Sequence, residues 1–302
     1  MLSNNVTMHL LTSCLSLCYN SKKLKNKKMQ TVAPKSAHVK FLRYPGGKQR
    51  MLTFLLPLLP SAKDIKGTYF EPFLGGGAVF FALTPHKAIL SDRNKELINL
   101  YAGLKMNSDA VWDHFQSFPD TKEDYYAIRA EDDGPLELKA ARTLYLNRTC
   151  FKGMWRYNSK GKFNVGYGGQ GRRWAISEKS LRDVSTHLKD ATLLNNDFEN
   201  VIGMSNKGDF IFLDPPYKPG AKEMDDGHYQ YGCFSFKDQQ RLSDALHDAS
   251  KRGVQWAMTT SSHPDILRLY LESCKITQIP HGTGSRLGII DENPGEVLIT
   301  NY

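Results

Sequence analysis

The chain has 302 residues, of which 40% are hydrophobic and 24% charged, and its formal net charge is +9. It is long enough to bury a full core as one large globular domain with an insertion, and the positive charge favours a polyanionic partner. Five scattered cysteines without any CxxC spacing argue against a zinc site and against a disulfide framework, and they indicate a reducing compartment.

Residues 1–39 are expected to be an appended leader. Met8–Tyr19 is a short apolar stretch, and five lysines follow it between Lys22 and Lys28. A signal peptide carries its positive charge before the apolar run, and this run is too short to span a bilayer. We therefore expect a disordered or weakly structured leader and no membrane span.

Organised sequence starts at Lys40. A strand is expected to begin at Phe41, ahead of the turn Pro45-Gly46-Gly47, and an apolar helix-like run from Met51 to Leu59 follows Lys48. A glycine turn before a lysine and a helix is a candidate pocket for an anion or a carboxylate. The reason is that bare backbone N–H groups and one cation converge there.

The next unit has the order strand, glycine turn, helix. Residues 68–73 predict a strand, Leu74-Gly75-Gly76-Gly77 a sharp turn, and residues 78–83 the start of a helix. A second strand, 87–91, ends at Asp92. In a Rossmann-type sheet such a turn lets a nucleotide-like ligand approach the backbone, and an acid at the tip of the second strand accepts hydrogen bonds from ribose hydroxyls. The alternative is that Asp92 only caps the next helix.

A basic segment follows four predicted helices, which span 93–106, 108–118, 121–130 and 135–147. From Lys139 to Asp190 there are twelve lysines or arginines and three acids. Asn158-Ser159-Lys160-Gly161 predicts the turn of a β-hairpin between aromatic-rich runs. A solvated surface loop has the same charge, but aromatic residues alternate with the cations and no acid lies between Arg148 and Arg173. This pattern favours binding of nucleic acid.

The alternation of strands and helices then resumes. The pair Asp197-Phe198 follows a predicted strand, 191–194, and is a candidate site for an adenine ring and its amino group, although Asp197 is equally suited to cap a helix. Further strands are predicted at 209–213, 254–260, 275–279 and 296–302, and helices at 177–188, 198–204, 236–251 and 264–271. The pattern predicts an α/β fold with a mainly parallel sheet.

The most informative stretch is Asp214-Pro215-Pro216-Tyr217, directly after the apolar strand. Two prolines make a stiff, extended segment that lacks backbone donors. A carboxylate beside a proline carbonyl offers two acceptors, which suit an exocyclic amino group with two N–H bonds, and the tyrosine offers a flat face for the ring. The alternative is an ordinary proline-rich turn after a strand. Together with the glycine turns, the acid at Asp92 and the basic hairpin, this tip predicts a nucleotide-like cofactor that reacts at an amine of a nucleobase. The sequence shows neither a Walker lysine-serine pair nor an evident metal cluster, which argues against phosphoryl transfer and zinc deamination.

From Phe41 to Tyr302 the chain resembles DNA adenine-N6 methyltransferases of the Dam type, the D12 class. The corresponding motifs occur in the family's order: FLRYPGGK from Phe41, EPFLGGG from Glu71, LSDRN from Leu90, LNR from Leu146, RYN from Arg156, FNV from Phe163, DPPY from Asp214 and EVLITNY from Glu296. The resemblance implies a Rossmann-like methyltransferase sheet with helices on both faces, formed by 40–107 and 191–302. It also implies a helical and β-hairpin target-recognition insertion at 108–190.

The resemblance further implies a methyl donor, S-adenosylmethionine, and a duplex DNA substrate whose target adenine is flipped out. Together with the reasoning above, it assigns Asp214, Pro215, Pro216 and Tyr217 to catalysis. The expected cofactor residues are Tyr44, Lys48, Phe73, Gly75, Gly76, Gly77, Asp92, Asp197, Phe198 and Asp214. The expected DNA-binding residues are Arg148, Lys152, Met154, Arg156, Asn158, Lys160, Lys162 and Asn164. We expect a monomer in the cytoplasm, or wherever the DNA is if the chain is viral, with a cognate restriction endonuclease as a candidate partner.

The insertion departs from the pattern of family members that methylate GATC. Lys152 stands where these members carry asparagine, and Gly166 stands where they carry proline, which argues against GATC as the target. Methylation of RNA or of a protein amide by the same fold is one alternative, although such enzymes more often resemble an Asn-Pro-Pro-Tyr pattern. A non-catalytic DNA-binding relative is the other, and the intact Asp214 and Lys48 argue against it.

Overall fold

The structure is a computed structural model that describes residues 41–44, 46–216, 234–279 and 295–302. The predicted leader, 1–39, and the catalytic candidate Tyr217 lie outside these residues. The chain divides into two units, Met1–Lys35 and Ser36–Tyr302, and the described residues all belong to the second. Among them, no helix is both long and apolar enough to cross a membrane.

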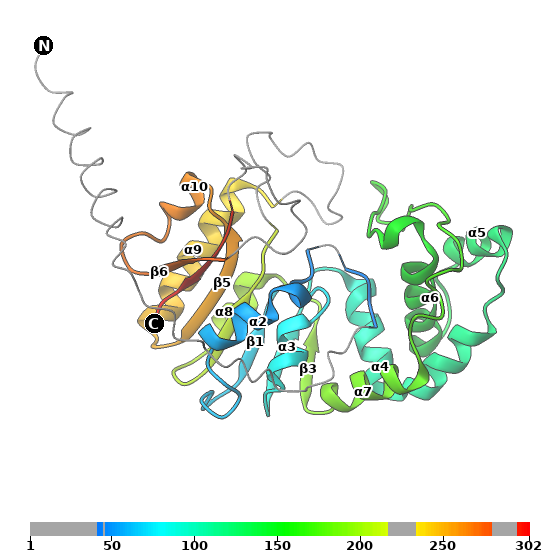
Figure 1. Ribbon diagram of the computed structural model, residues 1–302, viewed down its shortest axis with the longest axis horizontal. Helices are drawn as coiled ribbons and strands as arrows, with labels where there is room; N and C mark the ends of the chain where they lie inside the picture. The colour runs from blue at the N-terminus through cyan, green and yellow to red at the C-terminus, as the bar shows by residue number, and fades with distance from the viewer. Residues whose placement is uncertain (1–40, 45, 217–233, 280–294) are drawn as a thin grey trace, which may run out of the picture. The chain divides into compact units, whose positions relative to one another are not determined.

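A seven-stranded sheet in the order β3-β2-β1-β4-β5-β7-β6 is the centre of this unit (Figure 1). The strands are β1 (Tyr69–Glu71), β2 (Ala88–Ser91), β3 (Ala191–Leu194), β4 (Phe210–Leu213), β5 (Gln255–Ser261), β6 (Lys275–Gln278) and β7 (Glu296–Thr300). Strands β1 to β5 are parallel to one another, and β7 runs antiparallel to both β5 and β6. All seven predicted strands between 68 and 302 are thus present, whereas the strand expected to begin at Phe41 is not.

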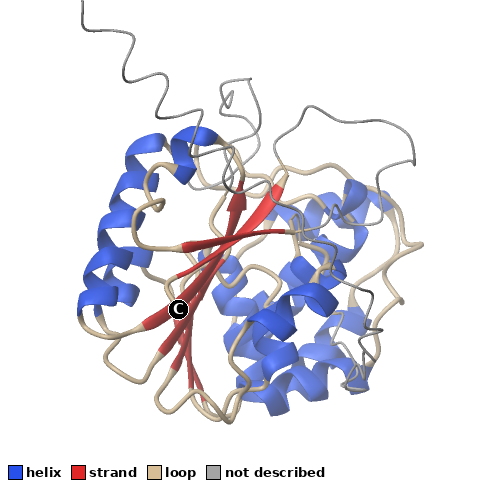
Figure 2. Cartoon of the chain, turned by 60° about the vertical axis from the view of Figure 1, so that its left-hand side comes forward, coloured by secondary structure: helices blue, strands red, loops and turns tan. Residues whose placement is uncertain are grey.

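Helices cover both faces of the sheet, as Figure 2 shows. Consecutive side chains of a strand point to opposite faces, and those of β4 enter two different cores. Phe210 and Phe212 pack with α2 (Leu52–Leu55), α3 (Ala78–Leu83) and α4 (Lys95–Ser117), whereas Ile211 and Leu213 pack with α8 (Phe198–Gly203), α9 (Phe236–Lys251) and α10 (Pro264–Leu267). The predicted α/β class, with a mainly parallel sheet between two helical layers, is confirmed.

The segment between β2 and β3 forms a helical insertion. It contains α4, α5 (Lys122–Ala130), α6 (Leu136–Thr149) and α7 (Glu178–Leu188), and α6 and α7 both pack on α4. Gly103 lets α6 approach α4, since a Cβ there would lie 2.5 Å from the Cβ of Ala140. The predicted break between two helices is a kink in α4, where Asn107 has φ −156° and accepts a hydrogen bond from the N–H of Ala110.

The predicted hairpin is present as a narrow loop joined by isolated bridges. It follows a short 3-10 helix, η3 (Phe151–Gly153), and the bridges pair Cys150 with Tyr167 and Tyr157 with Phe163. The Asn158 side chain closes the turn by accepting hydrogen bonds from the N–H groups of Lys160 and Lys162, both at 3.0 Å. The division into catalytic and target-recognition domains stays a prediction.

Candidate active site at the carboxyl ends of the strands

Three carboxylates lie where three adjacent parallel strands end. Glu71 ends β1, Asp92 follows β2, and Asp214 follows β4. Because β1 pairs with both β2 and β4 in parallel register, all three acids belong to the same edge of the sheet. In an open α/β sheet this edge is where ligands bind.

Asp214 is held by contacts from two separate elements. The hydroxyl of Thr259, a fully buried residue on β5, donates to its Oδ1 at 2.8 Å, and Lys48 Nζ lies 2.8 Å from the same oxygen. Lys48 begins a short 3-10 helix, η1 (Lys48–Arg50), and its side chain is only 5% exposed. A carboxylate with one oxygen fixed by a buried hydroxyl and a buried ammonium group has a defined orientation.

Lys48 lies between two carboxylates. Its Nζ is also 4.0 Å from Oε1 of Glu296, the first residue of β7, and it donates to the Gly46 carbonyl at 3.0 Å. Lys48 was predicted to contact the cofactor, which stays a prediction, and the contacts of its Nζ within the described residues include Asp214, Glu296 and the Gly46 carbonyl. Thr259 was not predicted at all, and its position opposite the end of β4 follows only from the pairing of β4 with β5.

The glycine turn between β1 and α3 is tightly closed. The N–H of Gly77 donates to the Leu74 carbonyl at 2.7 Å, and Gly75 and Gly77 have φ +48° and +64°, a left-handed conformation that favours glycine. A Cβ on Gly75 would lie 3.0 Å from the ring of Tyr44, which in turn packs against Trp155 at 5.4 Å between centroids. Tyr44 and the glycine turn, predicted separately for the cofactor, are therefore in contact.

Asp92 joins this turn to the tip of β2. One carboxylate oxygen accepts from the N–H of Gly75 at 3.0 Å and the other from the N–H of Asn94 at 2.9 Å. Asn94, not Asp92, caps α4 by accepting from the N–H of Leu97. Burial raises the pKa of the Asp92 carboxyl. Its predicted contact with a ribose stays a prediction.

Glu71 is a buried acid whose importance the sequence reasoning missed. The hydroxyl of Tyr69 donates to Oε2 at 2.7 Å, and the side chain is 2% exposed. Burial, with additional repulsion from Asp214 and Asp92, raises the pKa of its carboxyl to about 8. The signal available in the sequence is an acid directly before Pro72 at the end of a strand, which by itself indicates only where the strand stops.

Phe73, Asp197 and Phe198 come together beside α9. The rings of Phe73 and Phe198 stack at 5.4 Å between centroids, and the Arg241 guanidinium lies 4.9 Å from the Phe198 centroid. Asp197 caps α8 by accepting from the N–H of Glu199 and is 3.0 Å from Arg241 Nη2. The helix cap that was the alternative for Asp197 is therefore present, and binding of an adenine ring stays a prediction.

The predicted DNA-binding residues divide into exposed and packed groups. Lys152, Asn158, Lys160 and Lys162 are exposed, whereas Met154, Arg156 and Asn164 are half-buried and Arg148 is buried. Arg156 Nε donates to the Asn164 side chain at 2.9 Å across the loop. Arg148 Nε donates to the Arg172 carbonyl at 2.9 Å, and burial together with Arg43 and Arg172 lowers its pKa to about 10.

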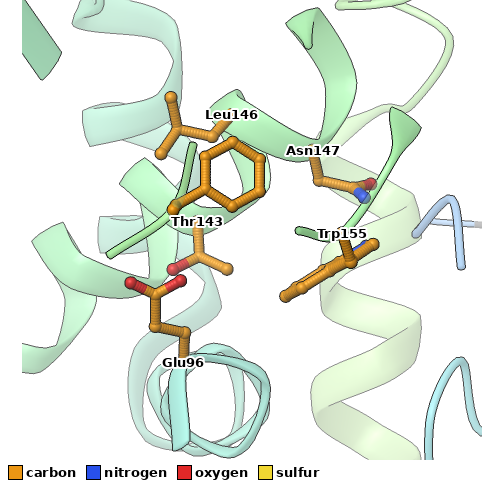
Figure 3. A pocket seen from close by; sticks show the side chains of 6 residues that line it. Glu96, Thr143, Leu146, Asn147 and Trp155 are labelled. Carbon is orange, nitrogen blue, oxygen red and sulfur yellow. The ribbon is translucent and has the colours of Figure 1, made fainter. Parts of the chain in front are cut away.

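Most aromatic residues of the insertion loop belong to the core that the loop shares with α2, α3, α4 and α6. Trp155, Tyr157 and Phe163 are buried, while Phe151 is half exposed with Lys152 Nζ 5.2 Å from its ring centroid. Glu96, Thr143, Leu146, Asn147, Trp155 and Phe163 line a small pocket under the loop (Figure 3). Asn147 and Trp155 also bond the backbone of Arg43, and they thereby tie the insertion to the segment that carries Tyr44.

Arg173 is a fully buried cation that closes the carboxyl end of α4. Its Nη2 donates to the carbonyls of Phe115 and Phe118 at 2.7 and 2.6 Å, and its Nη1 bonds the Asp120 carboxylate. The last carbonyls of a helix have no partner within the helix. Arg173 supplies partners for them, so its part in the insertion is structural.

We expect Arg173→Met to lower the free energy of unfolding by about 3 kcal/mol, because the helix-end carbonyls would stay buried without a donor. The adjacent Arg172 is exposed, so Arg172→Met is the matched control and should change stability little. Urea unfolding followed by circular dichroism measures both variants. Equal stabilities of the two would show that the buried bonds of Arg173 contribute nothing.

In the part of the chain that the structure describes, no group of three or more His, Cys, Asp or Glu side chains is placed to hold a metal ion.

Comparison with known proteins relates the chain to methyltransferases. A family model described as D12 class N6 adenine-specific DNA methyltransferase matches residues 44–284. Over 276 residues the chain is 32% identical to the Type II methyltransferase M1.LlaDCHI of Lactococcus lactis subsp. cremoris, and the match covers 87% of this chain and 95% of that protein. It is 33% identical to the Type II methyltransferase M.MjaIII of Methanocaldococcus jannaschii, with coverages of 79% and 90%. It is 32% identical to the DNA adenine methylase of Haemophilus influenzae, with coverages of 78% and 83%.

Proposed function

Because the chain belongs to the D12 class N6 adenine-specific DNA methyltransferase family, we propose that it transfers the methyl group of S-adenosylmethionine to an adenine flipped out of duplex DNA. The chain is an adenine-specific DNA methyltransferase by its family and its relatives. The donor, the extruded base and the role of each residue are the proposal. The observation that carries it is Asp214 at the tip of β4, fixed by Lys48 and Thr259 ahead of two prolines.

The residues at the strand ends fit S-adenosylmethionine. When bound, this donor supplies a methyl group on a positively charged sulfur, and its remaining groups are an ammonium, a ribose diol and an adenine. The site offers carboxylates for the cationic groups and the diol, with Asp92 as the ribose residue, and stacked rings of Phe73 and Phe198 beside Asp197 for the adenine. Gly75 and Gly76, both half-buried, present backbone without side chains, and Tyr44 lies against both of them.

Asp214 and the Pro215 carbonyl act together as acceptors for the two N–H bonds of the target amine. The lone pair of this amine is delocalised into the purine ring, so it is a weak nucleophile. Two acceptors on its hydrogens favour a pyramidal nitrogen with a localised lone pair. Lys48 and Thr259 keep the Asp214 carboxylate in place before the amine arrives, and a preorganised group needs no rearrangement during the reaction. An enzyme that acts on a base inside a duplex has to extrude that base, and Tyr217 is proposed to stack on the extruded ring.

The exposed face of the insertion loop is proposed to bind DNA. The lysines at its turn lie on exposed positions next to Asn158, whereas Arg156 is oriented by Asn164. Phosphate contacts bind all sequences alike, and base contacts specify one. We assign Lys160 and Lys162 to phosphates and Arg156 to a base edge, with Met154 as the apolar wedge.

Replacing both Lys160 and Lys162 by alanine is expected to weaken binding to every duplex alike. Each lysine that neutralises a phosphate releases counterions. The negative slope of log affinity against log salt concentration should therefore become less steep by about one unit per lysine removed. Fluorescence anisotropy with two unrelated duplexes at several salt concentrations measures this. Lys179→Ala on α7, another exposed lysine, is the control. An unchanged slope in the double variant would contradict the assignment.

The experiment that tests the function offers methyl-labelled S-adenosylmethionine with duplex DNA, with RNA and with a protein mixture in parallel. We predict label in the DNA alone, and single-molecule mapping of modified bases then identifies the target sequence. Label in RNA or protein and none in DNA would overturn the proposal in favour of methylation of one of those classes. No transfer to any acceptor, with intact cofactor binding, would favour a non-catalytic relative.

We further propose that the protein acts as a monomer, in the cytoplasm or wherever its DNA is found. The names of two relatives, Type II methyltransferases, support a cognate restriction endonuclease as a partner in the same system. Sedimentation of the protein alone and with a target duplex tests the oligomeric state.

A further inference from the structure

A buried glutamine lies in the first turn of α9. Gln239 is 2% exposed and shares the inward face of the helix with Leu242, Leu246 and Ala249. A buried amide costs free energy unless its donors and acceptors find partners, so an apolar residue would suit this face better. An amide at this position is therefore expected to have a specific hydrogen-bond partner.

The contact is with the segment that carries the catalytic carboxylate. Gln239 Nε2 donates to the Pro216 carbonyl at 3.3 Å. The Oε1 of the same amide is buried and has no hydrogen-bond partner within the described residues. Among the described residues, the amide nitrogen thus bonds Pro216, and the amide oxygen has no partner.

The hydrogen bond to Pro216 restricts a backbone angle that the proline rings leave free. The rings of Pro215 and Pro216 fix φ but not ψ, and a proline has no N–H with which to join a sheet. β4 ends at Leu213, and within the described residues its strand pairing does not extend to Pro216. A hydrogen bond to the Pro216 carbonyl restricts the ψ of that residue.

The support for Gln239 is itself anchored. α9 packs on β5 and α8, and it begins at a capping box in which Ser235 and Asp238 bond each other. Arg241, one half-turn further, bonds Asp197 and Glu199 at the start of α8. The first turn of α9 therefore offers Pro216 a fixed partner.

We propose that Gln239 is a positioning residue for the transfer reaction: it holds Pro216 from α9 while Lys48 and Thr259 hold Asp214 from the other side. The Pro215 carbonyl, the second acceptor of the target amine, lies between these two fixed points in the chain. The inference rests on the proposed roles of Asp214 and Pro215. Gln239 was not among the predicted site residues, and its proposed role is to act through Pro216.

The test compares Gln239→Met with Gln240→Met. Gln240 is the next residue and is exposed, so the two variants make the same chemical change inside and outside the contact. The single-turnover rate constant at saturating S-adenosylmethionine and DNA reports the transfer step without product release. Cofactor affinity by calorimetry and the thermal midpoint are measured on the same samples.

We expect Gln239→Met to lower the single-turnover rate about 10-fold, since a lost hydrogen bond of ordinary strength corresponds to that factor. Cofactor affinity should stay within about 2-fold. The thermal midpoint should change little, because the substitution removes a donor to the half-buried Pro216 carbonyl and also a buried oxygen that has no partner among the described residues. Gln240→Met should match the wild type.

A Gln239→Met rate equal to that of Gln240→Met would overturn the inference. So would a fall in rate accompanied by equal falls in cofactor affinity and thermal midpoint, because that pattern indicates a purely structural residue. Transfer to DNA by the wild type, and its loss in Asp214→Asn, test the proposed function. The role of Gln239 is tested separately, by the ratio of the single-turnover rate constants of Gln239→Met and Gln240→Met.

Discussion

Replacing Asp214 by asparagine is expected to lower the rate of methyl transfer by about 10³-fold or more while changing cofactor affinity only a few-fold. The amide presents an N–H group or a neutral oxygen where the carboxylate presents a charged acceptor, and groups aimed at developing charge contribute on this scale. Asparagine also removes the charge that pairs with Lys48 at 2.8 Å, so the orientation of the side chain weakens as well.

Single-turnover kinetics measures the loss, and calorimetry with S-adenosylmethionine measures binding. Asp244→Asn, at an exposed aspartate on α9, is the control and should retain full rate. If Asp214→Asn lost binding and rate together, Asp214 would serve the architecture of the site rather than the reaction. A variant with undiminished rate would remove Asp214 from the mechanism altogether.

Glu71→Gln is expected to change how the stability of the ligand-free protein depends on pH. The carboxyl has a pKa of about 8 in the folded protein, above the value of 4.5 that it has without the fold. The folded state therefore keeps a proton that the unfolded state has lost between these pH values. The stability that this carboxyl contributes is fully present below about pH 4.5 and is lost as the pH rises through about 8.

The size of this loss is on the order of a few kcal/mol, and glutamine removes it because an amide does not titrate. Urea unfolding at several pH values between about 5 and 9 should show a steep fall for the wild type and a flatter profile for Glu71→Gln. The variant should be the more stable of the two at about pH 8. Glu272→Gln, at an exposed position, should follow the wild type. Parallel profiles for all three proteins would contradict a buried neutral Glu71.

The sheet could be predicted from local sequence because its strands are short apolar runs bounded by turn residues. Parallel strands covered on both faces show such runs, and the chain from 68 to 300 alternates them with helical patterns. The break near Asn107 was also visible, since an asparagine side chain competes with the helix for backbone N–H groups. The strand expected at Phe41 is wrong, because the backbone of Arg43 bonds the side chains of Asn147 and Trp155 instead of a neighbouring strand.

The site was harder to predict where it depends on partners distant in sequence. Thr259 reaches Asp214 only through the pairing of β4 with β5, and Gln239 reaches Pro216 only through the packing of α9. Neither has a local signature, because a threonine in a strand and a glutamine in a helix are ordinary. Arg148 was predicted to bind DNA because it lies in a basic segment. In the structure its side chain is buried and donates to the Arg172 carbonyl, which the local sequence does not indicate.

The most direct test of the account is the chemical identity of the methylated product. Plasmid DNA is incubated with the wild-type protein and S-adenosylmethionine, digested to nucleosides and analysed by mass spectrometry, with Asp214→Asn in parallel. We expect N6-methyldeoxyadenosine from the wild type and a loss of this product in the variant. Methyl groups on cytosine, or N6-methyldeoxyadenosine formed equally by both proteins, would contradict it.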